Sequence, residues 1–274
     1  MNLNRIACIA VLLAASLAFS PWVQAEEPKS EFAVVQAEAQ KGDAHSQYVL
    51  GLMYDLGEGV RQDDAQAVEW YRKAAQQGHA EAQFILGASY AEGQGVRQDY
   101  AKAMEWYRKA AQQGHADAQR NLGVMYDLGQ GVRQDYAKAM EWYRKAAHQG
   151  EAKAQYNLGV MYAQGQGVRQ DYAKAMEWFR KAAYQGEAKA QYNLGVMYDQ
   201  GQGVRQDYAK AMEWYRKAAQ QGHAKAQYNL GVMYDEGQGV RQNTATAKEW
   251  FGQACDNGLQ EGCDEYARLN KAGF

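Results

Sequence analysis

Few residues of this chain could act as a nucleophile. After residue 25 the only serines are Ser30, Ser46 and Ser89, and none of them has a lysine three residues later. A serine that attacks β-lactams or peptidoglycan needs such a lysine or another base, because an unactivated hydroxyl is a weak nucleophile. We therefore predict that the chain is not an enzyme and has no catalytic residues.

The histidines and glycines do not indicate a metal or phosphate site. His79, His115 and His223 recur at one position of a repeated pattern. Stacked helices stand about 8–10 Å apart, whereas zinc needs its nitrogen ligands within about 2 Å, so we predict helix-capping or solvated histidines, no metal and no cofactor. The Gly-x-Gly-Val segments follow helices and lack a Gly-Lys-Ser/Thr ending, so we interpret them as turns.

The first 25 residues have the pattern of an export signal. Arg5 precedes an apolar run from Ile6 to Phe19, and Val23-Gln24-Ala25 offers a cleavage site after Ala25. The run is too short for a membrane span, so we predict a periplasmic or secreted protein without one. The net charge of −2 gives no attraction for nucleic acid, which we do not expect as a partner.

Cleavage would remove Cys8 and leave Cys255 and Cys263. In an oxidising compartment such a pair is expected to form a disulfide, which would contribute about 2 kcal/mol at the end of the chain. A reactive or metal-binding pair is the alternative.

Residues 43–258 consist of six tandem copies of a 36-residue unit. Each copy contains Leu-Gly and a tryptophan, and the copies are 43–78, 79–114, 115–150, 151–186, 187–222 and 223–258. Because a unit of this size cannot bury its apolar face alone, neighbouring units must stack. The sequence therefore predicts one elongated, monomeric all-α solenoid.

One unit, 151–186, reads as a helix hairpin. Ala154, Leu158 and Tyr162 form the apolar stripe of a first helix, and the recurring Gly159 indicates that another helix lies too close for a side chain. A Gly-Gln-Gly-Val turn follows, and Asp171 can cap a second helix. Residues 26–42 read as a linker and a lone second helix, and residues 259–274 as a lone first helix, which we expect to cap the two ends.

The order Ala118, Leu122-Gly123 and Tyr126, followed by Ala139, Tyr143 and Ala146, resembles the tetratricopeptide pattern. The glycine turn and the ending Trp-Tyr-Arg-Lys-Ala-Ala of the second helix resemble the Sel-one-like repeat family. This resemblance implies a right-handed superhelix of helix pairs that serves as a scaffold for protein complexes. The Cys255-x7-Cys263 pair also resembles the bridge of secreted, cysteine-rich bacterial members, some of which are described as penicillin-binding or weak β-lactamases.

A polar ladder on the first helices is the sharpest functional signal. Asparagine precedes Leu-Gly in four units, and a lysine stands one turn earlier in three of them: Asn121, Lys153, Asn157, Lys189, Asn193, Lys225 and Asn229. An asparagine amide suits bonding to an extended peptide backbone, and lysine can meet a carboxylate. In tetratricopeptide relatives this face lines a concave groove, so the resemblance implies a peptide-binding ladder. The alternative is that duplication copied an indifferent surface residue.

We therefore predict a non-enzymatic scaffold of the bacterial envelope that binds protein or peptide partners in its concave groove. Two alternatives remain. One is a β-lactamase or a penicillin-binding, peptidoglycan-acting envelope protein, and the other is a glycan-binding module that uses exposed aromatic residues.

Overall fold

A computed structural model describes residues 30–274, and every regular element in that part of the chain is an α-helix. The signal peptide, its cleavage site and Cys8 lie outside the described residues. No helix within residues 30–274 combines the length and the apolar character that crossing a bilayer requires.

The helices follow one another with short connections. Their bounds are α1 (Glu31–Gln40), α2 (Ala44–Leu56), α3 (Asp64–Gln76), α4 (Ala80–Glu92), α5 (Tyr100–Gln112), α6 (Ala116–Leu128), α7 (Tyr136–His148), α8 (Ala152–Gln164), α9 (Tyr172–Tyr184), α10 (Ala188–Gln200), α11 (Tyr208–Gln220), α12 (Ala224–Glu236), α13 (Thr244–Asp256) and α14 (Gln260–Lys271). The even-numbered helices from α2 to α12 are the first helices of the six units, and the odd-numbered helices from α3 to α13 are the second helices. Together they form a solenoid of helix hairpins, which confirms the predicted fold class.

The turns between the two helices of a hairpin depend on glycine. In the fourth unit Gly165 ends α8 in the left-handed region at φ 70°, where glycine has no steric penalty. The Asp171 side chain then accepts a hydrogen bond from the Lys174 backbone N–H and caps α9. The sequence predicted both the glycine stop and the aspartate cap.

The recurring mid-helix glycine permits close packing inside each hairpin. A Cβ placed on Gly159 would lie 2.5 Å from the ring of Phe179 on α9, and the other five units have a tyrosine or phenylalanine at the matching position. Phe179 itself is 2 % exposed. The predicted close approach is therefore confirmed, and the approaching group is the aromatic side chain of the same hairpin.

A buried glutamine joins each hairpin to the one before it. Gln155 donates to the Ala147 carbonyl oxygen of the preceding unit at 3.2 Å, and its own oxygen accepts from the Gln185 amide at 2.8 Å. The same position is buried in every unit. A buried amide must find such partners, so this repeated bridge holds three helices in register.

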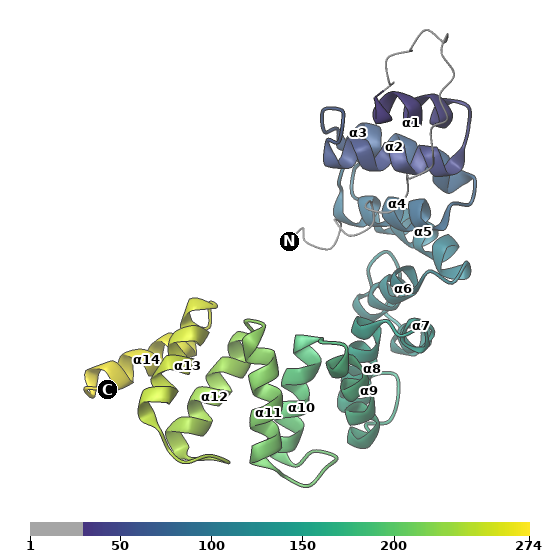
Figure 1. Ribbon diagram of the computed structural model, residues 1–274. Coiled ribbons are helices and arrows are strands. Elements are labelled where there is room, and N and C mark those ends of the chain that lie inside the picture. The colour runs from purple at the N-terminus through teal and green to yellow at the C-terminus, as the bar shows by residue number, and fades with distance from the viewer. Residues whose placement is uncertain (1–29) are drawn as a thin grey trace, which may run out of the picture.

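The single helix at the N-terminal end exposes polar residues where internal helices bury alanine. Glu31 and Glu38 of α1 are exposed and occupy the repeat positions of the buried Ala67 and Ala74 of α3. Figure 1 shows that the stack changes direction around α6 to α9, so that the solenoid forms an arc with α1 at one end and α14 at the other.

Candidate interaction face and the C-terminal bridge

The predicted ladder lies on exposed and half-buried positions of the first helices, a surface that we call the first-helix face. Lys153, Lys189 and Lys225 lie in the first turns of α8, α10 and α12, and all three side chains are exposed. We call them the lysine row. The four asparagines lie one turn further along α6, α8, α10 and α12 and are half-buried.

The lysine row has no internal counterion. Within residues 30–274 none of its three ammonium groups makes an ion pair or a side-chain hydrogen bond with another residue. The acids at the same repeat position do have partners, because Glu81 lies 3.0 Å from His115 and Asp117 lies 3.5 Å from Arg120. The three lysines therefore leave positive charge without an ion pair over the last three hairpins, and Glu187 at the N-cap of α10 is an acid beside them that also makes no ion pair in this part of the chain.

The asparagines differ from the lysines because most of them already contact a tyrosine. The Asn193 amide bonds the Tyr156 hydroxyl of the preceding unit, and the Asn229 amide bonds the hydroxyl of Tyr192. Burial raises the pKa of both phenols, and the asparagine contacts oppose that shift. These amides can offer a ligand only the groups that the tyrosines leave free.

The other two asparagines have different surroundings. Asn121 bonds the hydroxyl of Tyr107, whose pKa burial raises to about 12. Asn157 has no such partner among the described residues, because the preceding unit carries Arg120 in place of a tyrosine at the contacting position. The asparagine recurs in four consecutive units, but these asparagines differ in whether their amide groups remain available to hydrogen-bond a ligand.

Histidines cap first helices and stack on aromatic residues of the preceding unit. The His223 ring lies 4.6 Å from the Tyr192 ring, and its Nδ1 accepts a hydrogen bond from the Ala226 N–H. His79 and His115 make the corresponding contacts with Tyr48 and Phe84. Burial lowers the pKa of His79 and of His223, which favours the neutral ring that a cap requires. The predicted helix-capping role is confirmed.

A half-buried acid supports the aromatic core of some hairpins. Tyr143 donates to the Asp127 carboxylate at 3.2 Å, and burial raises the pKa of that carboxyl group. The fourth unit has lost both partners together, with Ala163 and Phe179 at the two positions. Sequence reasoning did not find this pair, because the two positions do not change together throughout the chain: the second unit has Ala91 with Tyr107, and the sixth has Asp235 with Phe251.

The polarity of the first-helix face changes along the chain. Val49 and Ile85 occupy the asparagine position in the first two units, and Leu128 at the end of α6 is 61 % exposed. The N-terminal half of the face is therefore more apolar than the half that carries the lysine row.

The tryptophans lie on the second helices and serve packing. In five units a lysine one turn later covers the indole, as Lys181 does over Trp178 at 4.1 Å from the ring centroid. Tyr184 is 76 % exposed and meets Trp214 edge-on at 5.7 Å. This is the aromatic residue on the second helices that a sugar could reach most easily.

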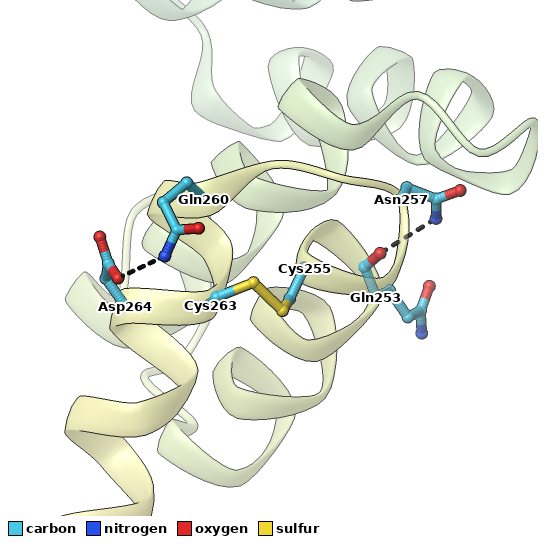
Figure 2. The surroundings of a disulfide bond; sticks show 6 residues. All are labelled: Gln253, Cys255, Asn257, Gln260, Cys263 and Asp264. Carbon is cyan, nitrogen blue, oxygen red and sulfur yellow. Dashed lines mark hydrogen bonds between the residues drawn. A yellow bond between two sulfur atoms is a disulfide. The ribbon is translucent and has the colours of Figure 1, made fainter.

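Cys255 and Cys263 form a disulfide between α13 and α14, as predicted (Figure 2). The two cysteines occupy the repeat positions of Ala219 and Gln227, where the glutamine donates to the alanine carbonyl at 3.1 Å. A covalent bond thus replaces the hydrogen bond that joins the internal units. Gly262 lets α14 approach, because a Cβ there would lie 2.9 Å from the Cys255 backbone nitrogen.

The described residues offer no obvious constellation for catalysis or metal binding. Ser30 caps α1, and the Ser89 hydroxyl donates to the Ile85 carbonyl. No group of three or more His, Cys, Asp and Glu side chains within residues 30–274 could hold a metal ion. A hollow of about 410 Å³ lies at the end of the first-helix face, between Tyr228, Phe251 and Arg268. Arg268 bonds Asp235 and Glu265 at its rim.

Comparison with known proteins identifies the family. The Sel1 repeat profile matches residues 44–79, 80–115, 116–151, 152–187, 188–223 and 224–259, so the chain belongs to the Sel1 repeat family. Proteins of this family generally mediate protein–protein interactions, which supports the coarse prediction of an interaction scaffold. The matched units begin one residue later than the units read from the sequence.

Solved structures and one curated protein show the same relationship. A protective antigen present in uropathogenic Escherichia coli strains, which displays an SLR fold, is 40 % identical with a TM-score of 0.85, over 88 % of this chain and 52 % of that one. A Sel1 repeat protein from Oxalobacter formigenes is 36 % identical with a TM-score of 0.72, over 78 % of this chain and 86 % of that one. The ERAD-associated E3 ubiquitin-protein ligase component HRD3A of Arabidopsis thaliana is 39 % identical over 49 residues. The chain spans about half of the first structure, and the match to HRD3A covers 7 % of that protein.

Proposed function

We propose that the protein binds a protein or peptide partner along its first-helix face, without catalysing a reaction on it. The observation that carries this proposal is the lysine row, whose three exposed ammonium groups have no counterion within residues 30–274. The concave surface of an α-solenoid is the surface that such proteins use for extended contacts. Asn157 adds an amide with its bonding capacity free.

We further propose that the protein acts in the bacterial envelope after removal of residues 1–25. Support comes from the pattern around Arg5 and Ala25 and from the disulfide, since disulfides persist in oxidising compartments. Mass spectrometry of the protein purified from its native host should find Glu26 as the first residue. A cytoplasmic protein that begins at Met1 would contradict this part of the proposal.

Partner capture from an envelope extract tests the binding face. The face variant carries Asn157→Ala, Asn193→Ala and Asn229→Ala, and the matched control carries Glu177→Ala, Glu213→Ala and Glu249→Ala on exposed positions of the second helices. Circular dichroism checks that the face variant keeps its helices after losing the tyrosine contacts. A partner lost by the face variant and kept by the control supports the proposal. Equal recovery of every partner by both variants would reject it.

A second candidate function is glycan binding through Tyr184, which the structure leaves 76 % exposed beside Trp214. Aromatic faces can stack on sugars, and exposed aromatic residues are enriched at binding surfaces. Retention of the protein on insoluble peptidoglycan, lost on Tyr184→Ala, would favour this function over the first. Covalent labelling by a fluorescent penicillin would instead favour the enzymatic alternative.

A further inference from the structure

The charge at one repeat position changes sign along the first-helix face. From the first unit to the sixth the residues there are His45, Glu81, Asp117, Lys153, Lys189 and Lys225. Glu81 contacts the His115 ring, whose Nδ1 accepts the Ala118 N–H, and Asp117 pairs with Arg120, whereas the three lysines make no ion pair within the described residues. The face therefore presents a row of positive charge over α8, α10 and α12 and carries acidic residues before it.

The spacing of this row fits an extended chain that crosses the helices. Consecutive first helices touch, since Tyr192 on α10 stacks on His223 at the start of α12 at 4.6 Å. Axes of packed helices lie about 8–10 Å apart, and an extended chain in the polyproline II conformation advances about 3.1 Å per residue with three residues per turn, so that every third side chain points the same way. One lysine is therefore met about every third residue of a segment that runs across α8, α10 and α12.

The surroundings of the row favour a peptide over a polyanion such as nucleic acid. Tyr156, Val160 and Tyr192 lie beside the lysines on the same helices and are partly exposed, so they can accept apolar side chains. Glu151 and Glu187 lie at the N-caps of α8 and α10 and limit the positive charge to a narrow line. A nucleic-acid site would need a broader basic surface, and the chain as a whole carries a net charge of −2.

We propose that the partner segment bound by the first-helix face is an extended acidic peptide with a carboxylate at about every third residue, each meeting one member of the lysine row. This inference rests on the proposed function and adds the chemistry of the partner to it. The segment crosses α8, α10 and α12 with its carboxylates on Lys153, Lys189 and Lys225, and its intervening side chains lie against the tyrosines and valines between them.

Fluorescence anisotropy with synthetic peptides tests the proposal on the mature protein. One labelled peptide carries aspartate at every third position, and a second has the same composition with its aspartates adjacent to one another. The row variant is Lys153→Gln, Lys189→Gln, Lys225→Gln. The matched control is Arg169→Gln, Arg205→Gln, Arg241→Gln, which removes the same charge from exposed loop positions of the same three units.

We expect the spaced peptide to bind the wild type and the control with the same Kd. The Kd should rise about tenfold in the row variant, because each exposed ion pair contributes roughly a twofold to threefold factor in affinity. The clustered peptide should bind several-fold more weakly than the spaced one, and added salt should weaken both.

Three results would overturn the inference: equal Kd values for the row variant and the wild type, equal binding of the clustered and spaced peptides, or tighter row-dependent binding of inorganic polyphosphate. The last result would assign the row to a phosphate polyanion. If these peptides fail while partner capture still depends on the asparagines of the first-helix face, only the acidic chemistry is wrong. If capture is independent of that face, the proposed function fails as well.

Discussion

The C-terminal bridge offers a direct test of how the units are joined. The disulfide connects two positions that a glutamine and a backbone carbonyl connect at the preceding junction. A double variant Cys255→Ala, Cys263→Gln therefore rebuilds the internal junction at the end of the solenoid. The variant Cys255→Ala, Cys263→Ala removes the bridge and provides no substitute.

The expected magnitudes follow from the length of the closed loop. The cysteines are 8 residues apart, and closing a loop of this length contributes about 2.5 kcal/mol in the chain-entropy treatment. A buried hydrogen bond of the kind that Gln227 makes contributes about 1 kcal/mol. The Ala/Gln variant should therefore recover a little under half of what the Ala/Ala variant loses.

Hydrogen exchange followed by mass spectrometry measures this loss where it occurs. In a solenoid each unit mainly contacts its neighbours, so α14 opens locally and its amides report the junction. We expect α14 amides to exchange about 70-fold faster in the Ala/Ala variant and about tenfold faster in the Ala/Gln variant than in the wild type. Exchange in α2 to α10 should not change. Equal rates in the two variants would refute the equivalence of the bridge and the glutamine bond.

Three further predictions concern internal units. Burial lowers the pKa of His223, and its neutral ring caps α12, so the free energy of unfolding should fall as the pH drops below about 6.5. Urea titrations at pH 7.5 and 5.5 measure this loss, which His223→Asn should reduce. Tyr143→Phe should cost about 1 kcal/mol in the same assay by leaving the half-buried Asp127 carboxylate without its donor. Adding Asp127→Ala should restore most of that loss, and an additive double variant would contradict the pairing. Gly159→Ala should cost about 1–3 kcal/mol by crowding Phe179, and an unchanged unfolding midpoint would show that the hairpin can relax around a methyl group.

Much of the fold follows from local sequence signals. The 36-residue period, the Leu-Gly pair and the Trp-containing second helix predict a stack of hairpins. Gly165 ends α8 through its own backbone conformation, and Asp171 caps α9 by a hydrogen bond three residues along the chain. The position of the disulfide could also be predicted, because the repeat register places Cys255 at the end of one helix and Cys263 at the start of the next. Each of these signals lies within one unit or at one junction.

The contacts that were missed join residues whose proximity depends on how the units stack. The bridge made by Gln155 was not predicted, because its partners Ala147 and Gln185 lie 8 residues before it and 30 residues after it. The asparagines were predicted as peptide ligands, with copied surface residues as the alternative, and neither interpretation included the contact between Asn193 and Tyr156 of the preceding unit. Only the packing of neighbouring first helices brings such pairs together. The peptide-binding role of the ladder stays a prediction, and the lysine row is the part of it that the structure leaves most accessible.

Site-specific photo-crosslinking in the native host tests the central claim most directly. A photoreactive amino acid is placed in turn at Asn157 and Lys189 on the first-helix face, and at Glu177 and Glu213 on the second helices as controls. We predict that the first two positions form a crosslink to the same partner protein and that the two controls form none. Crosslinking to that partner from Glu177 and Glu213, with none from Asn157 and Lys189, would show that the protein binds through its other face.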